Sequence, residues 1–310
     1  MITVGGFNTS VDKSLEVDDL KAGGVHRVRR LQAWPGGKGL HVALTAAALG
    51  EPVRLVGLID SAHRREFEDV LGARGVEFHG VETKGGLRTC LAIRDQGGAR
   101  ITEILEPGPE LDAATRDELC ARLLRSSETS RLAVLSGSAP PGFADSAYGD
   151  LVGTLRAAGL RCLVDASGGL LRGAVEARPF LIKPNREEAE ALTGGRIEGL
   201  PAAAQVARTL GQRGIVMVVV SLGAEGAVAA CEGRVAHASV SVSGSLHPVG
   251  SGDCLLGGIA VGLARGQGWE DALRLGVACG AANTLSAETG WVRREDVDAL
   301  LPRVASVVLS

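Results

Sequence analysis

Apolar residues occur in this chain as short runs, each next to a longer stretch with helical spacing. The runs are rich in Val, Ile and Leu and cover residues 53–58, 132–135, 160–164, 180–182 and 215–220. Helical spacing is present over residues 40–49, 64–74, 113–125, 147–158, 186–192, 202–213, 255–264, 269–285 and 294–307. This alternation predicts an α/β fold, in which helices cover both faces of a mostly parallel sheet.

The pattern changes towards the C-terminus. Residues 227–231 and 234–238 flank Glu232 and Gly233, which predicts an antiparallel hairpin. Three helices are expected after it, the last over residues 294–307. We therefore expect the sheet to end at the hairpin.

Two segments, 11–34 and 86–105, do not follow the alternation. Each segment carries short alternating patterns with interleaved charges and has no helix between its own patterns, which predicts a small β-lid. A chain of 310 residues with one continuous sheet is expected to form a single α/β domain, residues 1–310, carrying this lid. Because the apolar face of such a lid needs a cover, we expect a homodimer through the lid.

Composition narrows the class of partner to small molecules. The net charge is −3, and the chain contains no run of five or six like charges. Nucleic acid and membrane surfaces are therefore not expected as partners. The six cysteines occur singly, without the spacing of a zinc site or a disulfide framework. No apolar stretch reaches membrane-spanning length, and the first residues do not resemble a secretory leader. A cytoplasmic location is therefore expected.

The most informative motif lies at residues 249–258. Gly250, Ser251 and Gly252 can direct backbone N–H groups towards one point, where an apolar helix begins. Asp253 beside such an anion site suits a base that takes a proton from the group attacking a phosphoryl group. The alternative is a solvent-facing turn in which Asp253 caps the helix. The motif therefore suggests a kinase, and the other segments must decide between this interpretation and a plain capping turn.

A second glycine-rich motif, Gly36-Gly37-Lys38-Gly39, precedes an Ala-rich helix. It can bring N–H groups and one ammonium to a polar ligand, or it is a flexible turn with a solvated lysine. It is not a Walker A loop, and no Gly-x-Gly-x-x-Gly follows the first strand. His41, four positions after Gly37, either donates to a ligand or caps the helix.

Two further turns follow strands. Asn185 and Glu188 have the spacing of a capping box, and they also suit Mg²⁺ bound through water beside nucleotide phosphates. Ser221, Gly223 and Gly226 lie in a glycine-rich turn that either approaches a nucleotide or simply closes a hairpin.

Polar residues that suit a sugar occur near the first strand and in the lid segments. Asn8 and Asp12 follow the first strand, and a carboxylate there suits two vicinal hydroxyls. Arg88 and Arg27 can pair with a substrate phosphate or are solvated edge charges. Ser138 lies in a Pro/Gly-rich loop, at residues 136–142, that either faces the substrate or is a plain turn.

In this order the segments resemble the PfkB, or ribokinase-like, family of sugar kinases, and most closely its 1-phosphofructokinase and tagatose-6-phosphate kinase branch. The matching strings include residues 8–12, 36–39, 102–110, 136–142, 182–185, 221–226 and 248–253. The resemblance implies that Asp253 is the catalytic base beside an anion hole at Gly250, Ser251 and Gly252. It assigns ATP and Mg²⁺ to Lys183, Asn185, Glu188, Ser221, Gly223 and Gly226, with Asn283 beside the nucleotide base. It assigns the sugar phosphate to Asp12, Gly37, Lys38, Arg88 and Ser138, with Gly36, His41 and Arg27 as further candidates.

One departure from the family pattern bears on the acceptor. His41 replaces the usual Asn, and Thr9-Ser10 replaces a pair that usually contains Pro. An imidazole is larger than a carboxamide and can carry charge, so we expect it to favour a shorter or more acidic acceptor than a hexose phosphate. The alternatives to a kinase of a phosphorylated ketose are a kinase of an unphosphorylated sugar or nucleoside, and a non-catalytic sugar-phosphate sensor.

Overall fold

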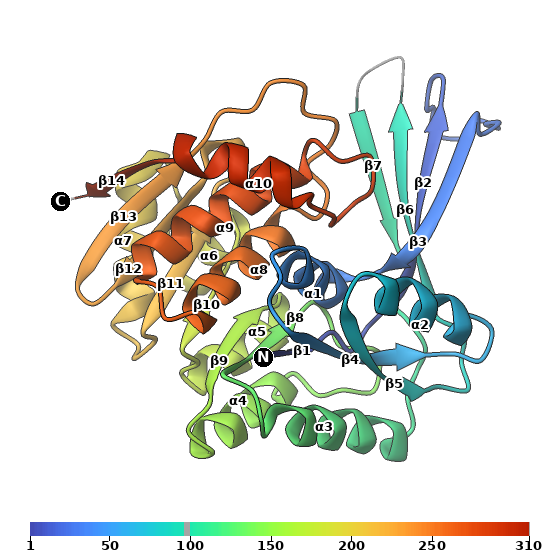
Figure 1. The fold of residues 1–310 in the computed structure, drawn as a ribbon, viewed down its shortest axis with the longest axis horizontal. Helices are drawn as coiled ribbons and strands as arrows, with labels where there is room; N and C mark the ends of the chain where they lie inside the picture. Colours follow the sequence, from blue (N-terminus) through green and yellow to red (C-terminus); the bar gives the residue numbers. More distant parts are fainter. Residues whose placement is uncertain (96–99, 310) are drawn as a thin grey trace.

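The central strands of the main sheet are buried on both faces, and helices cover the sheet on either side (Figure 1). A computed structural model describes residues 1–95 and 100–309. Its ten neighbouring strands are, in spatial order, β14 (Ala305–Leu309), β13 (Arg234–Ser239), β12 (Ala227–Cys231), β11 (Met217–Ser221), β10 (Leu181–Ile182), β9 (Arg161–Asp165), β8 (Leu132–Ser136), β1 (Ile2–Gly5), β4 (Val53–Ile59) and β5 (Val76–Glu82). The strands from β11 to β5 run parallel, and β12, β13 and β14 pair antiparallel. The predicted α/β class is confirmed.

Helices cover both faces of this sheet. One face packs against α1 (Lys38–Ala48), α2 (Arg64–Ala73), α8 (Ser251–Ala264), α9 (Trp269–Asn283) and α10 (Arg294–Leu300). The other packs against α3 (Ala113–Ser127), α4 (Ala147–Ala157), α5 (Gly168–Glu176), α6 (Arg186–Thr193) and α7 (Gly199–Gly211). Successive side chains of β8 alternate between these two cores, because strand side chains point to opposite faces. Within the described residues, no helix has the length and apolarity to cross a membrane.

A second, four-stranded sheet projects from the main sheet (Figure 1). Its order is β3 (Arg30–Gly36), β2 (Ser10–Val17), β6 (Arg88–Asp95) and β7 (Arg100–Leu105). The strands come from the two segments whose short alternating patterns predict a lid, although residues 96–99 lie outside the described part. β2 starts and β3 ends beside the main sheet, with Ser10 opposite Gly36.

The C-terminal segment corrects two predictions. Instead of continuing to residue 307, α10 ends at Leu300 and a 3₁₀ turn follows over Leu301–Arg303. Pro302 lies in this turn, and proline does not continue a helix because it lacks the backbone N–H. β14 then pairs with β13, so the sheet does not end at the hairpin. Strand β5 and helix α5 were also absent from the predicted elements.

The carboxyl ends of the parallel strands meet along one edge, which places polar residues together. β9 ends at Asp165 and β11 at Ser221, while Lys183 directly follows β10. Asn8 and Ser138 follow β1 and β8 within a few residues. This edge adjoins the base of the lid, and ligands of open α/β sheets bind at such edges.

Candidate active site

Asp253 lies in the first turn of α8 and is almost completely buried. The N-cap, Gly250, has a φ of 83°, which favours glycine. The helix begins at Ser251, so Ser251 and Gly252 belong to its first turn and not to a preceding loop. Ser251 N–H donates to Pro248 O and Asp253 N–H to Gly250 O, both at 3.1 Å. In the part of the chain that the structure describes, the Gly252 N–H makes no such bond, and it remains available to an anion.

His41, on the first turns of α1, lies between two carboxylates. Its Nδ1 is 2.9 Å from Asp253 Oδ2, and its Nε2 is 3.4 Å from Asp12 Oδ2. A neutral imidazole has one N–H, whereas both ring nitrogens here face an anionic oxygen. Burial lowers the pKa of His41, but the contacts with Asp12 and Asp253 outweigh it and raise the pKa to about 10. The ring is therefore an imidazolium at neutral pH.

Asp12 is held from several sides. Ser10 Oγ donates to Asp12 Oδ1 at 2.6 Å. Burial raises the pKa of Asp12, yet the contacts with His41 and Ser10 bring it below its ordinary value. A Cβ atom added to Gly36 would come within 2.0 Å of the Asp12 carboxyl carbon, so only glycine allows the β3 backbone to lie there. Glycine at position 36 of the motif therefore leaves room for the Asp12 carboxylate.

Two lysines and one aspartate gather beside the start of α8. Lys183 Nζ is 3.0 Å from Asp165 Oδ2, and both side chains are buried. A Cβ atom on Gly252 would be 3.4 Å from Lys183 Nζ, so this ammonium lies next to the α8 turn. The charge of Asp165 raises the pKa of Lys38, the first residue of α1, although burial opposes it. These groups suit a phosphate.

Asn185 and Glu188 form the predicted capping box at the start of α6. Glu188 N–H donates to Asn185 Oδ1 at 2.8 Å, and Asn185 N–H donates to Glu188 Oε2 at 2.9 Å. The other carboxylate oxygen of Glu188 takes no part in the capping box. Among the described residues, no three His, Cys, Asp or Glu side chains are grouped to hold a metal ion. The pair therefore fits a Mg²⁺ ion bound through water, with phosphates as the main ligands.

The turn after β11 lies next to this capping box. Asn185 forms a parallel bridge with Ser221, and Ser221 N–H donates to Pro184 O at 3.0 Å. Gly223 begins a 3₁₀ turn, and no atom lies within 4 Å of the place its Cβ would take. A Cβ on Gly226 would come within 2.1 Å of a β13 carbonyl oxygen. Gly223 thus borders open space, whereas Gly226 allows the turn to pack on the sheet.

Asn283, the last residue of α9, is completely buried. Its Nδ2 donates to Val249 O at 2.8 Å and to Ser251 Oγ at 3.0 Å. The side chain holds the turn that leads into α8. Its expected position beside a nucleotide base remains a prediction.

At the sugar end the structure brings three of the predicted residues together. Asn8 Nδ2 donates to Ser138 Oγ at 3.0 Å, and Arg88 Nε donates to Asn8 O at 3.1 Å. Arg27 is different, because it is exposed between β2 and β3, at the far end of the lid from Gly36. At about 3.3 Å a residue, β3 separates the two by roughly 20 Å. Arg27 is therefore not brought to this subunit's site.

Three residues of the site were not assigned a role from the sequence: Asp165, Glu103 and Gly290. Asp165 ends a predicted strand, which is a usable signal for a residue at the ligand edge. Glu103 of β7 lines a hollow of about 20 Å³ with Asp12 and Thr289. Although the residue is exposed overall, partial burial of its carboxyl raises the pKa of Glu103, as do the charges of Asp12 and Asp253. Gly290 packs on His41 and carries no local signal.

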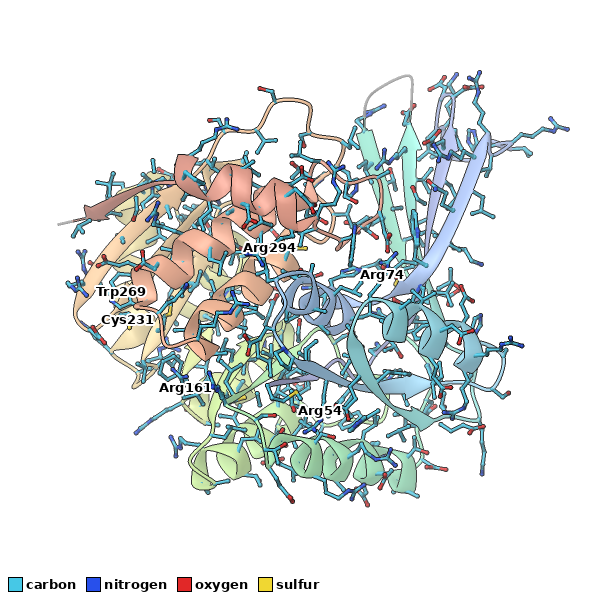
Figure 2. All side chains as sticks on the ribbon, viewed as in Figure 1. Arg54, Arg74, Arg161, Cys231, Trp269 and Arg294 are labelled. Atoms are coloured by element: carbon cyan, nitrogen blue, oxygen red, sulfur yellow. The ribbon has the colours of Figure 1, made fainter. Side chains whose placement is uncertain are left out.

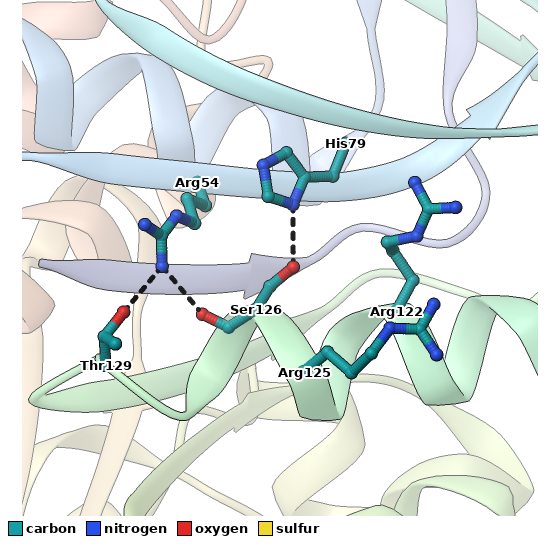
Figure 3. A pocket seen from close by; sticks show the side chains of 6 residues that line it. All are labelled: Arg54, His79, Arg122, Arg125, Ser126 and Thr129. Atoms are coloured by element: carbon teal, nitrogen blue, oxygen red, sulfur yellow. Dashed lines mark hydrogen bonds between the residues drawn. The ribbon is translucent and has the colours of Figure 1, made fainter.

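A larger hollow, of about 400 Å³, lies between the C-terminal part of α3 and strands β4 and β5 (Figure 3). Arg54, Arg122 and Arg125 line it, but Arg54 pairs with Glu77, and the other two pair with Glu118. Each of these arginines thus has a carboxylate partner, although Arg122 and Arg125 share one. The size of this hollow does not make it the reactive site, which is at the carboxyl ends of the parallel strands.

Comparison with known proteins places the chain in a family. The profile of the pfkB family carbohydrate kinases matches residues 3–292. The chain is 31% identical over 310 residues to a tagatose-6-phosphate kinase of Staphylococcus epidermidis, covering 98% of both chains. It is 32% identical over 312 residues to a 1-phosphofructokinase of Xanthomonas campestris, covering 98% of this chain and 96% of that one.

Solved structures agree. Phosphofructokinase-2 from Escherichia coli, in complex with substrates and products, superimposes with a TM-score of 0.90 at 26% identity, covering 97% of this chain and 98% of that one. A ribokinase from Thermotoga maritima, 20% identical, shares the fold with a TM-score of 0.78 over 96% of this chain and 98% of that one. With the buried aspartate at a helix start and the lysines beside it, these matches show that the chain belongs to the pfkB family of carbohydrate kinases.

Proposed function

We propose that this kinase transfers the γ-phosphoryl group of ATP to a hydroxyl of a phosphorylated ketose, with Asp253 as general base. The observation that carries the proposal is the buried Asp253 carboxylate at the start of α8, with Lys183 next to Gly252 of the same turn and Asp12 linked to Asp253 through His41. The names of the tagatose-6-phosphate kinase and 1-phosphofructokinase relatives support this acceptor class.

The reaction is a single in-line displacement. The acceptor hydroxyl gives its proton to the free oxygen of Asp253, and its oxygen forms a bond to the γ-phosphorus. The bond from that phosphorus to the β–γ bridging oxygen breaks, and ADP leaves with the electron pair. The Gly252 N–H and the Lys183 ammonium favour the negative charge that develops on the transferred group.

The acceptor is proposed to lie against Asp12, with its own phosphate near Arg88 and Lys38. Asp12 accepts from vicinal hydroxyls, whereas the guanidinium and the ammonium attract a phosphate. Both ring nitrogens of His41 already face carboxylates, so the ring has no N–H to offer an acidic acceptor. A phosphorylated ketose therefore agrees better with the geometry than a more acidic sugar does.

ATP is proposed to bind along the carboxyl ends of β10 and β11, between the Asn185 capping box and the Gly223 turn. Glu188 and Asn185 would hold Mg²⁺ through water. When bound, this ion neutralises charge on the phosphates. The protein's own share is to align the phosphates with the α8 turn and to exclude water beneath the lid.

The lid also supports a homodimer. Leu31 and Ile104 lie on the same face of its strands and are each more than half exposed. Covering such side chains contributes about 25 cal/mol per Å² of apolar surface. Light scattering of the wild type and of a Leu31→Lys, Ile104→Lys variant tests this proposal. A wild type that is monomeric at micromolar concentration would remove it.

A coupled ADP-release assay tests the acceptor, using fructose 1-phosphate, fructose 6-phosphate, tagatose 6-phosphate, ribose and nucleosides. We expect the highest kcat/KM with one of the phosphorylated ketoses, and ADP release by Asp253→Asn that is roughly 10²–10⁴ times slower under the same conditions. A preference for ribose or a nucleoside would favour a kinase of unphosphorylated acceptors. Binding of sugar phosphate without ADP release would favour a sensor.

A further inference from the structure

We infer that His41 is a positioning residue, an imidazolium that ties the base Asp253 to the acceptor-binding carboxylate Asp12. The inference rests on the function proposed above, because it needs Asp253 to be the base. It differs from a direct role towards substrate, since neither ring nitrogen is free. What carries it is one ring that contacts two carboxylates from different elements, β2 and α8.

Close packing also restricts the position of the His41 ring. His41 is buried in α1, and a Cβ atom on Gly290 would come within 2.0 Å of its Cγ and Cδ2. The backbone at Gly290 therefore covers the ring, which leaves the imidazole little room to change rotamer. Since the ring is fixed, its two N–H groups fix the carboxylates of Asp12 and Asp253 relative to each other.

The contact has two consequences for the base. His41 Nδ1–H donates to Asp253 Oδ2, so only the other Asp253 oxygen is left for the acceptor proton. The positive ring also stabilises the ionised form of Asp253 and offsets its repulsion from Asp12 and from an incoming phosphoryl group. A neutral carboxamide in place of His41 has one donor group and no charge, so it cannot do both.

Other charged groups surround this trio but do not replace the ring. Those that act on it electrostatically are Glu103 on β7, Lys38 at the start of α1, Arg88 on β6 and His247 before α8. Burial lowers the pKa of His247 to about 4, so that imidazole is neutral. The charge of Asp165 has the largest effect on Lys38, and Arg88 donates to the backbone carbonyls of Asn8 and Glu106. Among the described residues, only His41 contacts both carboxylates.

Kinetics of His41→Asn and His41→Gln over a range of pH tests the inference. We expect kcat/KM near neutral pH to fall about 10- to 100-fold, since misplacing a reacting group has effects of this order. In a plot of kcat/KM against pH, the decline on the acidic side (the acid limb) should move to higher pH by about one unit, because the base loses a positive neighbour. KM for ATP should stay within about twofold, since His41 does not contact the proposed nucleotide groups.

His79 offers a matched control. Its ring also bridges two oxygens, Ser126 Oγ and Glu77 Oε1, both at 2.7 Å, but it lies on the edge strand β5; Figure 3 shows the contact with Ser126. His79→Asn should leave the acid limb and kcat/KM unchanged. An acid limb that stays in place in His41→Asn, with kcat/KM near that of the wild type, would overturn the inference.

NMR of the wild type labelled with ¹⁵N-histidine gives a readout that does not depend on turnover. Both nitrogens of His41 should have the shifts of a protonated imidazolium at about pH 8, where an ordinary histidine is neutral. A neutral ring at that pH would refute the inference even if the variants fail to fold. A wild type that turns over no acceptor, but keeps the imidazolium, would instead count against the proposed function.

Discussion

Gly290 is wedged between the imidazole of His41 and the turn that begins α8. A Cβ at Gly290 would meet the His41 ring at 2.0 Å, and a Cβ at Gly250 would meet Gly290 N at 2.5 Å. The loop that holds Gly290 is tied to the end of α2. Arg74, the C-cap residue of that helix (Figure 2), forms two hydrogen bonds with Glu288, and its guanidinium lies 4.3 Å from the centre of the Trp291 ring. The positions of the base and of its imidazole thus depend on one glycine backbone.

Replacing Gly290 by Ala should therefore damage the site more than the fold. The residue has a φ of 67°, which costs a non-glycine residue about 1–2 kcal/mol, and the new methyl group must also displace the His41 ring. We expect a loss of kcat/KM of about 100-fold, measured by ADP release.

Gly159 is the matched control for this change. Its φ is 77°, and nothing lies within 4 Å of its missing Cβ. Gly159→Ala should show the backbone cost in thermal unfolding while keeping its activity. Equal activity losses in the two variants would mean that backbone strain, and not contact with His41, explains the effect.

Removing the carboxylate of Asp165 should destabilise the protein strongly. Asp165→Asn leaves the Lys183 ammonium buried without its counter-charge, and breaking one side of a buried pair costs about 3–5 kcal/mol. Chemical denaturation measures this. Adding Lys183→Met should restore part of the stability but not activity, because the ammonium proposed to bind phosphate is then lost. If the double variant is no more stable than the single one, the buried pair does not explain the loss.

Asn283→Ala should lower kcat by about tenfold for ATP and for GTP alike. The side chain holds Val249 and Ser251, so its removal loosens the turn that presents the Gly252 N–H, whichever base is bound. Rates with both nucleotides check this. A selective loss with one nucleotide would instead support the expected role beside the base.

Asp253→Asn keeps the shape of the side chain and removes its ability to accept a proton. We expect turnover to fall by roughly 10²–10⁴, with binding of ATP retained in a fluorescence titration. Turnover close to that of the wild type would show that Asp253 is not the general base.

The pH dependence of stability should report the charge on His41. Its pKa is about 10 in the folded protein, compared with an ordinary value of 6.5. Below about pH 6.5 both states carry the proton and the stabilising contribution is complete. It decreases as pH rises and is lost once pH passes about 10, since the folded ring then also loses its proton.

Thermal unfolding of the wild type and of His41→Asn over this range checks the sign. The difference in unfolding temperature should be largest near pH 6.5 and should shrink towards pH 10. A difference that grows with pH would contradict a charged ring between the two carboxylates.

Local features of this protein followed from the sequence because they involve neighbouring residues. The Asn185–Glu188 capping box needs only four positions, and the uninterrupted apolar run at β8 predicts a strand covered on both faces. Besides the missed β5 and α5, one element was given the wrong type: the helix predicted to continue to residue 307 came from apolar spacing that fits both periods. The segment after Pro302 became a strand because the edge of β13 was free to pair with it.

What only the tertiary structure decided is which distant groups meet. His41 and Asp253 are 212 positions apart, and the sequence left His41 open between a ligand contact and a helix cap. Arg27 likewise had the right chemistry, but the lid places it at the wrong end. The sequence by itself determined the α/β class, most of the elements, the family and the candidate motifs, because short-range periodicity and turn chemistry are encoded locally. The charge of His41 and the role of Gly290 depend on how α1, α8 and the lid pack together, since burial and opposed carboxylates arise only in the folded chain.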